Sequence, residues 1–67
     1  MTELQSEHLS DLEKKVVDLV ETGYTRWKIA EEIGLGETTV RSVIRRLCQR
    51  FDCSMKDLPT VIPREER

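Results

Sequence analysis

The sequence has little of the material from which catalytic sites are built. Its 67 residues include one histidine, two cysteines and three glycines. A chain of this length buries only about 60% of the surface that its unfolded form exposes, which supports a thin core but no enclosed cavity. It contains no glycine-rich phosphate loop and no cysteine–histidine arrangement. We therefore expect no enzyme activity, no catalytic residue, no metal site and no cofactor.

Long apolar runs are also missing from the sequence. No segment reaches the roughly 20 apolar residues that a membrane-spanning helix needs. Residues 1–7 are polar and acidic, unlike the start of a signal peptide. These two absences predict a cytoplasmic location and no membrane partner.

Cysteine chemistry is limited to Cys48 and Cys53, which lie five residues apart. A disulfide at this spacing would distort a helix end. A metal site would need a closer pair of cysteines or nearby histidines, and His8 is far away along the chain. We expect free thiols, with Cys48 in the core and Cys53 partly buried.

The net charge of −2 is unevenly distributed along the chain. Residues 1–35 contain eight acidic and four basic residues, whereas residues 36–67 contain five acidic and seven basic ones. Four arginines and no acid lie between Arg41 and Arg50. Because salt screens charges beyond about 8–10 Å, this cluster sets the local field and favours an anionic partner such as nucleic acid.

Signals for helix starts and ends recur along the chain. Ser10 and Glu13 form a capping box for a first helix, which Gly23 ends. Thr25 is a good N-cap for the second helix. The first expected helix follows the Ser10 cap and runs to about residue 22, and the others span about 26–33, 37–51 and 55–58.

The segment after the third helix is expected to be short and loosely organised. Ser54 caps the fourth helix and Pro59 ends it. Residues 60–63 are expected to be extended or loose. The predicted organisation is a flexible N-terminal lead at 1–8, a helical domain at 9–59 and a flexible C-terminal tail at 60–67.

One window of the sequence has the spacing of a helix-turn-helix. Ala30 is small enough for two helices to approach closely, and Gly34 can adopt the positive φ of a helix C-terminal turn. Leu35 is expected to fill the core between the helices, with Val40 and Val43 packing back from the second. The expected fold is therefore all-α, with four short helices and a central helix-turn-helix. The alternative is two ordinary amphipathic helices joined by a glycine.

The third helix is a candidate for reading DNA bases. Arg41 and Arg45 are four residues apart and so share one side of the helix, with Ser42 beside them. An α-helix fits the major groove of DNA, and each bidentate arginine–guanine pair provides about 1–3 kcal/mol of discrimination. The alternative is that both arginines are solvated surface charges.

Contacts to the DNA phosphates are expected at the margins of this helix and at the start of the second helix. Alternatively, the two threonines act only as helix caps and Trp27 packs against a helix edge. Arg50 has its own alternative, an ion pair with Asp52 or Asp57. The candidates for phosphate contact are Thr25, Arg26, Trp27, Thr38, Arg46 and Arg50.

Three short segments share their residues and spacing with a known family. They are Gly23-Tyr24-Thr25-Arg26-Trp27-Lys28-Ile29-Ala30, Ile33-Gly34-Leu35 and Thr39-Val40-Arg41. On these motifs, residues 9–58 resemble the DNA-binding domain of LuxR/GerE-type transcription regulators, with region four of the sigma factors as the next most similar family. The resemblance implies four helices and base contacts by Arg41, Ser42 and Arg45.

The resemblance also implies a dimer. In that family the fourth helix often forms the dimer contact, which corresponds here to Met55, Leu58 and Val61. The sequence departs from the family pattern at Asp52, which stands where a glycine usually follows the third helix.

Two functions are consistent with these observations. The leading hypothesis is a small sequence-specific regulator that binds double-stranded DNA as a homodimer on a two-fold site, because one domain of this size reads only a few base pairs. The alternative is a helix-turn-helix module that binds another transcription protein, a polymerase subunit or a larger regulator, with weak or no DNA binding. Replacing Arg41 and Arg45 would abolish the first function and spare most forms of the second.

Overall fold

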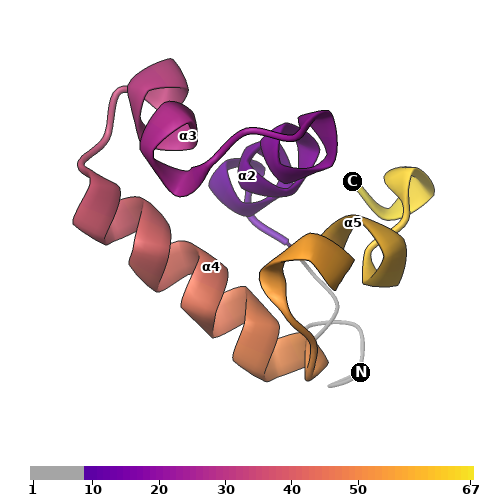
Figure 1. Ribbon diagram of the computed structural model, residues 1–67. Helices are drawn as coiled ribbons and strands as arrows, with labels where there is room; N and C mark the ends of the chain where they lie inside the picture. Colours follow the sequence, from indigo (N-terminus) through magenta and orange to yellow (C-terminus); the bar gives the residue numbers. More distant parts are fainter. Residues whose placement is uncertain (1–8) are drawn as a thin grey trace.

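A computed structural model describes residues 9–67 of the chain. These residues form four α-helices, two short 3₁₀ helices and no strand, as the sequence predicted for an all-α fold. In Figure 1, α3 and α4 are joined at the left, while α5 packs beside α2 and α4. The elements in chain order are α2 (Asp11–Thr22), α3 (Arg26–Ile33), α4 (Glu37–Phe51), η1 (Met55–Asp57), α5 (Leu58–Val61) and η2 (Arg64–Glu66). The predicted N-terminal lead, 1–8, lies outside the described residues.

The caps predicted for α2 and α3 are present. The Glu13 amide donates to Ser10 Oγ over 3.1 Å, and the Ser10 amide donates to Glu13 Oε1 over 2.9 Å, which completes the capping box. The Lys28 amide donates to Thr25 Oγ1 over 3.2 Å and caps α3. These bonds satisfy backbone groups that a helix start otherwise leaves without partners.

Left-handed residues end the first three helices of the described chain. Gly23 has φ 98° and Gly34 has φ 74°, so both predicted glycine turns are confirmed. Asp52 ends α4 with φ 54°, in the position where a glycine was expected from the family pattern. A side chain in this region of φ is disfavoured, although Asp tolerates it better than most residues.

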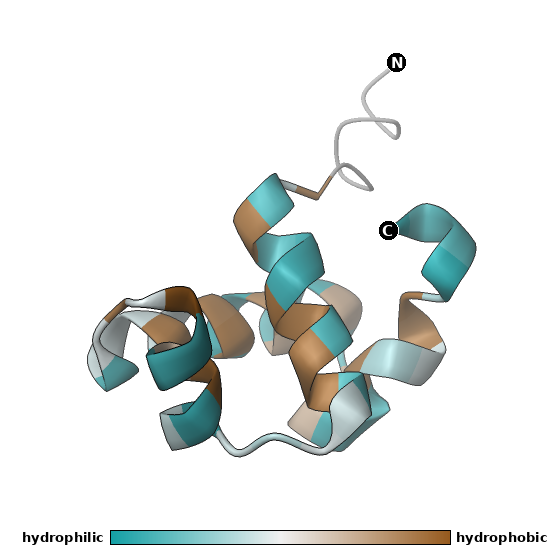
Figure 2. Ribbon diagram, turned by 90° about the horizontal axis from the view of Figure 1, so that it is seen from above, coloured by the Kyte–Doolittle hydropathy of each residue, from teal (hydrophilic) through white to brown (hydrophobic). Residues whose placement is uncertain are grey.

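The core consists of apolar side chains contributed by every α-helix. The buried side chains are Leu9, Val16, Val17, Ile29, Ala30, Val40, Ile44, Leu47, Leu58 and Ile62. Colouring by hydropathy shows brown, apolar stretches alternating with teal, polar ones along the helices, as amphipathic helices require (Figure 2). None of the helices within 9–67 is long and apolar enough to cross a membrane.

The prediction for Leu35 is wrong. Its side chain is 40% exposed and does not fill the space between α3 and α4. The amides of Gly34 and Leu35 both donate to the Ala30 carbonyl oxygen, over 2.9 and 3.1 Å, and this tight turn carries Leu35 past the core. Ile29 of α3 and Val40 of α4, both fully buried, belong to the core instead.

The predictions for residues 59–63 are also wrong. Pro59 lies in the first turn of α5 and does not end a helix, because a proline is tolerated where the backbone amide has no intrahelical partner. The helix continues to Val61, and Ile62 is only 2% exposed. The segment predicted as a flexible tail therefore contributes Ile62 to the core, and η2 follows it.

Candidate nucleic-acid interface

The outer face of α4 presents the three residues predicted to contact bases. Arg41, Ser42 and Arg45 are all exposed. The opposite face of the helix is fixed in the core by Val40 and Leu47, both fully buried. Neither arginine has an ion-pair or hydrogen-bond partner for its guanidinium within residues 9–67. A rigid helix thus holds two available guanidinium groups toward solvent.

The other two arginines of α4 are not brought together with Arg41. Nine residues separate Arg41 from Arg50, which is about two and a half turns at 3.6 residues per turn, so the two side chains leave opposite sides of the helix. Arg50 lies toward α2, where its Nη1 is 3.8 Å from Glu13 Oε1. Its guanidinium also lies 5.5 Å from the centre of the Phe51 ring. Arg46 is exposed on the side of the helix between them.

The start of α3 supplies a second group of polar atoms. The Thr25 hydroxyl accepts from the Lys28 amide, as its role as a cap requires, and its own proton is still available to a ligand. Arg26 and Trp27 follow in the first turn, where backbone amides have no intrahelical acceptor. Trp27 is 59% exposed, so packing against a helix edge does not account for it. Thr38, in the first turn of α4, is exposed as well.

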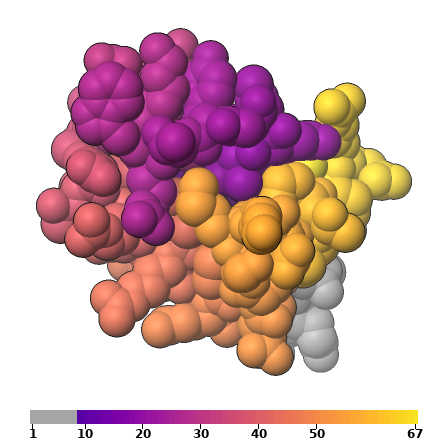
Figure 3. Space-filling model, viewed as in Figure 1, coloured from indigo at the N-terminus to yellow at the C-terminus, as the bar shows by residue number. Residues whose placement is uncertain are grey.

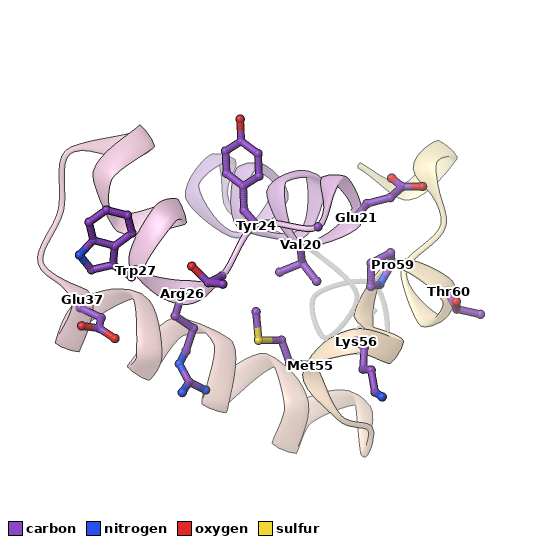
Figure 4. Close-up of a pocket in the computed structure, with 12 residues that line it drawn as sticks. Val20, Glu21, Tyr24, Arg26, Trp27, Glu37, Met55, Lys56, Pro59 and Thr60 are labelled. Carbon is purple, nitrogen blue, oxygen red and sulfur yellow. The ribbon is translucent and has the colours of Figure 1, made fainter.

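A groove of about 770 Å³ connects these elements to the segment after α4. In the space-filling view, residues of α2 and α3, in purple, meet residues of η1 and α5, in orange, on one face (Figure 3). The close-up shows the side chains that line the groove (Figure 4). They include Tyr24, Arg26, Trp27 and Glu37 on one side and Met55, Lys56, Pro59 and Thr60 on the other.

Lys56 is the lining residue that sequence reasoning missed. It lies thirty residues after Arg26 in the chain, outside the helix-turn-helix spacing, and no local pattern singles it out. Only the packing of η1 against α2 and α4 brings it to the same groove.

The three residues predicted for a dimer contact differ in their exposure. Val61 is 41% exposed and Met55 is half-buried. Leu58 is fully buried against the core and presents no surface to a partner, so its prediction as an interface residue needs correction.

Acidic, cysteine and histidine side chains do not gather into a metal site within residues 9–67. Cys48 and Cys53 carry free thiols, and both are partly buried. Burial raises the pKa of Cys48, and burial with the nearby Cys48, Asp57 and Asp52 raises that of Cys53. A raised pKa keeps both thiols protonated and poor as nucleophiles or ligands at neutral pH.

Comparison with protein families gives one match. The GerE family, described as bacterial regulatory proteins of the luxR family, matches residues 7–57 of the chain. Comparisons with curated proteins and with solved structures found no match. The family match covers 51 of the 67 residues, and the chain therefore belongs to the luxR family of bacterial regulatory proteins.

Proposed function

We propose that this luxR-family chain is a sequence-specific regulator that binds double-stranded DNA by placing α4 in the major groove. One observation carries the proposal: Arg41, Ser42 and Arg45 are exposed on a helix whose other face is fixed in the core. Arginine donates two hydrogen bonds to guanine, and serine pairs with several base edges. Membership of a family of bacterial regulatory proteins supports a regulatory role, and the proposal includes no catalysis.

The phosphate contacts in this proposal come from both sides of α4. The Thr25 hydroxyl, the Arg26 guanidinium and the first-turn amides of α3 face one strand, and exposed Trp27 lies along its sugars. Thr38 and Arg46 extend the contacts along α4. Arg50 contributes less than the sequence suggested, because Glu13 already offsets part of its charge.

The proposed complex is a homodimer on a two-fold site in the cytoplasm, where bacterial DNA lies. A single domain of this size reads only a few base pairs, so two copies provide the specificity that a regulator needs. Val61, with Met55 beside it, is the proposed contact between copies, since Val61 is the large apolar residue that α5 exposes. Leu58 is buried in the core and makes no contact between copies in this proposal.

A second candidate function is the binding of another transcription protein, a polymerase subunit or a larger regulator. The observation that favours it is the exposure of Trp27 and Leu35, 59% and 40%, on a chain of net charge −2. Exposed apolar surface marks protein contacts, and aromatic residues are enriched in protein–protein interfaces.

Selection of bound genomic fragments by the purified protein, at about 150 mM salt, separates the two functions. The wild type should enrich a two-fold motif, and an Arg41→Ala/Arg45→Ala variant should lose it. A Lys14→Ala/Lys15→Ala variant removes the same charge from α2 and should keep the motif. No enrichment by the wild type, or equal enrichment by the arginine variant, would overturn the DNA-reading proposal. Capture of a polymerase subunit would then establish the second function.

A further inference from the structure

Lys56 is an exposed cation whose ammonium group has no partner within residues 9–67. Outside Arg41, Arg45 and Arg46, four of the eight basic residues in the described part of the chain form ion pairs. The paired ones are Lys28 with Glu31, Arg50 with Glu13, Arg64 with Glu21, and Arg67 with Asp18 and Glu21. Lys56 and Arg26 are the two cations that line the groove, one on each side of it. In Figure 4 their side chains extend in the same direction, and Met55 lies between them.

The groove is net cationic once the ion pairs of Glu21 with arginines outside the groove are considered. Two of its lining residues are acidic, Glu21 and Glu37. The Glu21 carboxylate already accepts from Arg67 over 2.9 Å and from Arg64 over 3.4 Å. This leaves one unpaired carboxylate, Glu37, against the two cations. The apolar side chains between them form a low-dielectric wall, which strengthens the field on an anion in the groove.

Glu37, at the start of α4, connects the groove to the arginine side of that helix. Glu37 lines the groove, and Arg41 and Arg45 follow it at intervals of four residues, so all three share one side of the helix. Arg26, at the start of α3, and Lys56, on η1, line the same groove, so a strand whose phosphate contacts Arg26 is within the surface that Lys56 also lines.

We propose that Lys56 binds a phosphate of the same DNA strand that Arg26 and the start of α3 contact. This inference rests on the proposed function and extends the DNA interface beyond the helix-turn-helix to η1. A lysine contact to phosphate contributes affinity without reading sequence, and it releases a counterion. Its signature is thus a change in salt dependence at an unchanged sequence preference.

The test measures affinity as a function of salt for the wild type and three variants, on the selected duplex and on a scrambled one. Lys56→Ala should lower the slope of log affinity against log salt by about 0.9 on both duplexes. The factor by which affinity falls between about 50 and 200 mM salt should therefore be about 3.5-fold smaller for Lys56→Ala than for the wild type. Lys56→Arg should restore the slope. Lys15→Ala, the same loss of charge at an exposed position of α2, should leave it unchanged.

Each failure has a different meaning. A wild-type slope for Lys56→Ala, on a protein that loses its motif with Arg41→Ala/Arg45→Ala, would overturn the Lys56 contact and leave the proposed function intact. A changed sequence preference, or a loss that follows the dimer fraction in sedimentation, would overturn it also, because Lys56 would then act on bases or on the neighbouring Met55. Absence of DNA binding by the wild type would overturn both proposals.

Discussion

The guanidinium of Arg67 donates from Nη1 to Glu21 Oε1 over 2.9 Å and so joins the segment after α5 to α2. The same nitrogen donates to Asp18 Oδ1 over 2.6 Å. Arg67 Nε donates to the Ile62 carbonyl over 2.9 Å, which gives a partner to a backbone oxygen at the end of α5. The Arg67 side chain is only 3% exposed, so this contact holds α5 against α2 from a position shielded from water.

The first prediction concerns acid stability at this contact. The hydrogen bond from Arg67 lowers the pKa of Glu21 below its ordinary value of 4.5, partial burial opposes the shift, and Arg64 adds to it. A carboxyl with a lowered pKa stabilises the fold above its unfolded pKa, and that stabilisation is lost as the pH falls through the lowered value. Glu21→Gln should therefore lower stability at neutral pH and weaken its dependence on pH on the acid side.

Urea unfolding of the wild type and Glu21→Gln, measured at several pH values from neutral to acid, checks this prediction. Arg67→Ala should reproduce the flatter profile, because it removes the main cause of the shift. Arg64→Ala is the matched control, since Arg64 is 80% exposed and its contact with Glu21 is longer, at 3.4 Å. Parallel profiles for wild type and Glu21→Gln would contradict the role assigned to this carboxylate.

The second prediction concerns the end of α4. Asp52 has φ 54°, and its carboxylate lies at the negative end of the helix dipole. Asp52→Gly should raise the free energy of unfolding by about 1 kcal/mol, because it relieves the left-handed strain and removes the charge. Asp52→Asn removes only the charge and should give a smaller gain. A stability for Asp52→Gly at or below that of the wild type in thermal unfolding would refute this account.

The third prediction separates the core from the proposed dimer contact. Leu58→Ala should cost about 2–5 kcal/mol of a total of about 5–15 kcal/mol, because the side chain is fully buried. Val61→Ala should cost less than about 0.5 kcal/mol, because Val61 is 41% exposed.

Val61→Glu then tests the dimer directly. It should leave thermal unfolding of the monomer nearly unchanged and shift sedimentation toward the monomer, since a carboxylate would be buried between two copies. Dimer formation that is equal in wild type and Val61→Glu would exclude α5 as the contact between copies.

Much of the helix-turn-helix could be predicted from the sequence because its signals are local. The capping box of Ser10 and Glu13, the Thr25 cap and the glycines at 23 and 34 each act within a few residues, and each is present where expected. The exposure of Arg41, Ser42 and Arg45 follows in the same way from helical spacing against a buried face. The predictions for Leu35 and Pro59 were wrong because each local pattern is compatible with two structures. An apolar residue in a turn can be buried or exposed, a proline can follow a helix or lie in its first turn, and packing decides which occurs.

What the sequence determined by itself is where the first three described helices begin and end, which family the chain resembles, and which side of α4 is polar. These properties depend on caps, positive φ angles and a period of 3.6 residues, all of which a short stretch of chain carries. The tertiary structure alone decided the contacts between distant segments. It placed Lys56 in the groove with Arg26, turned Arg50 toward Glu13, buried Leu58, and bound Arg67 to α2. The physical reason is that burial and ion pairing depend on which surfaces meet in space, and residues thirty or more positions apart carry no local signal of that meeting.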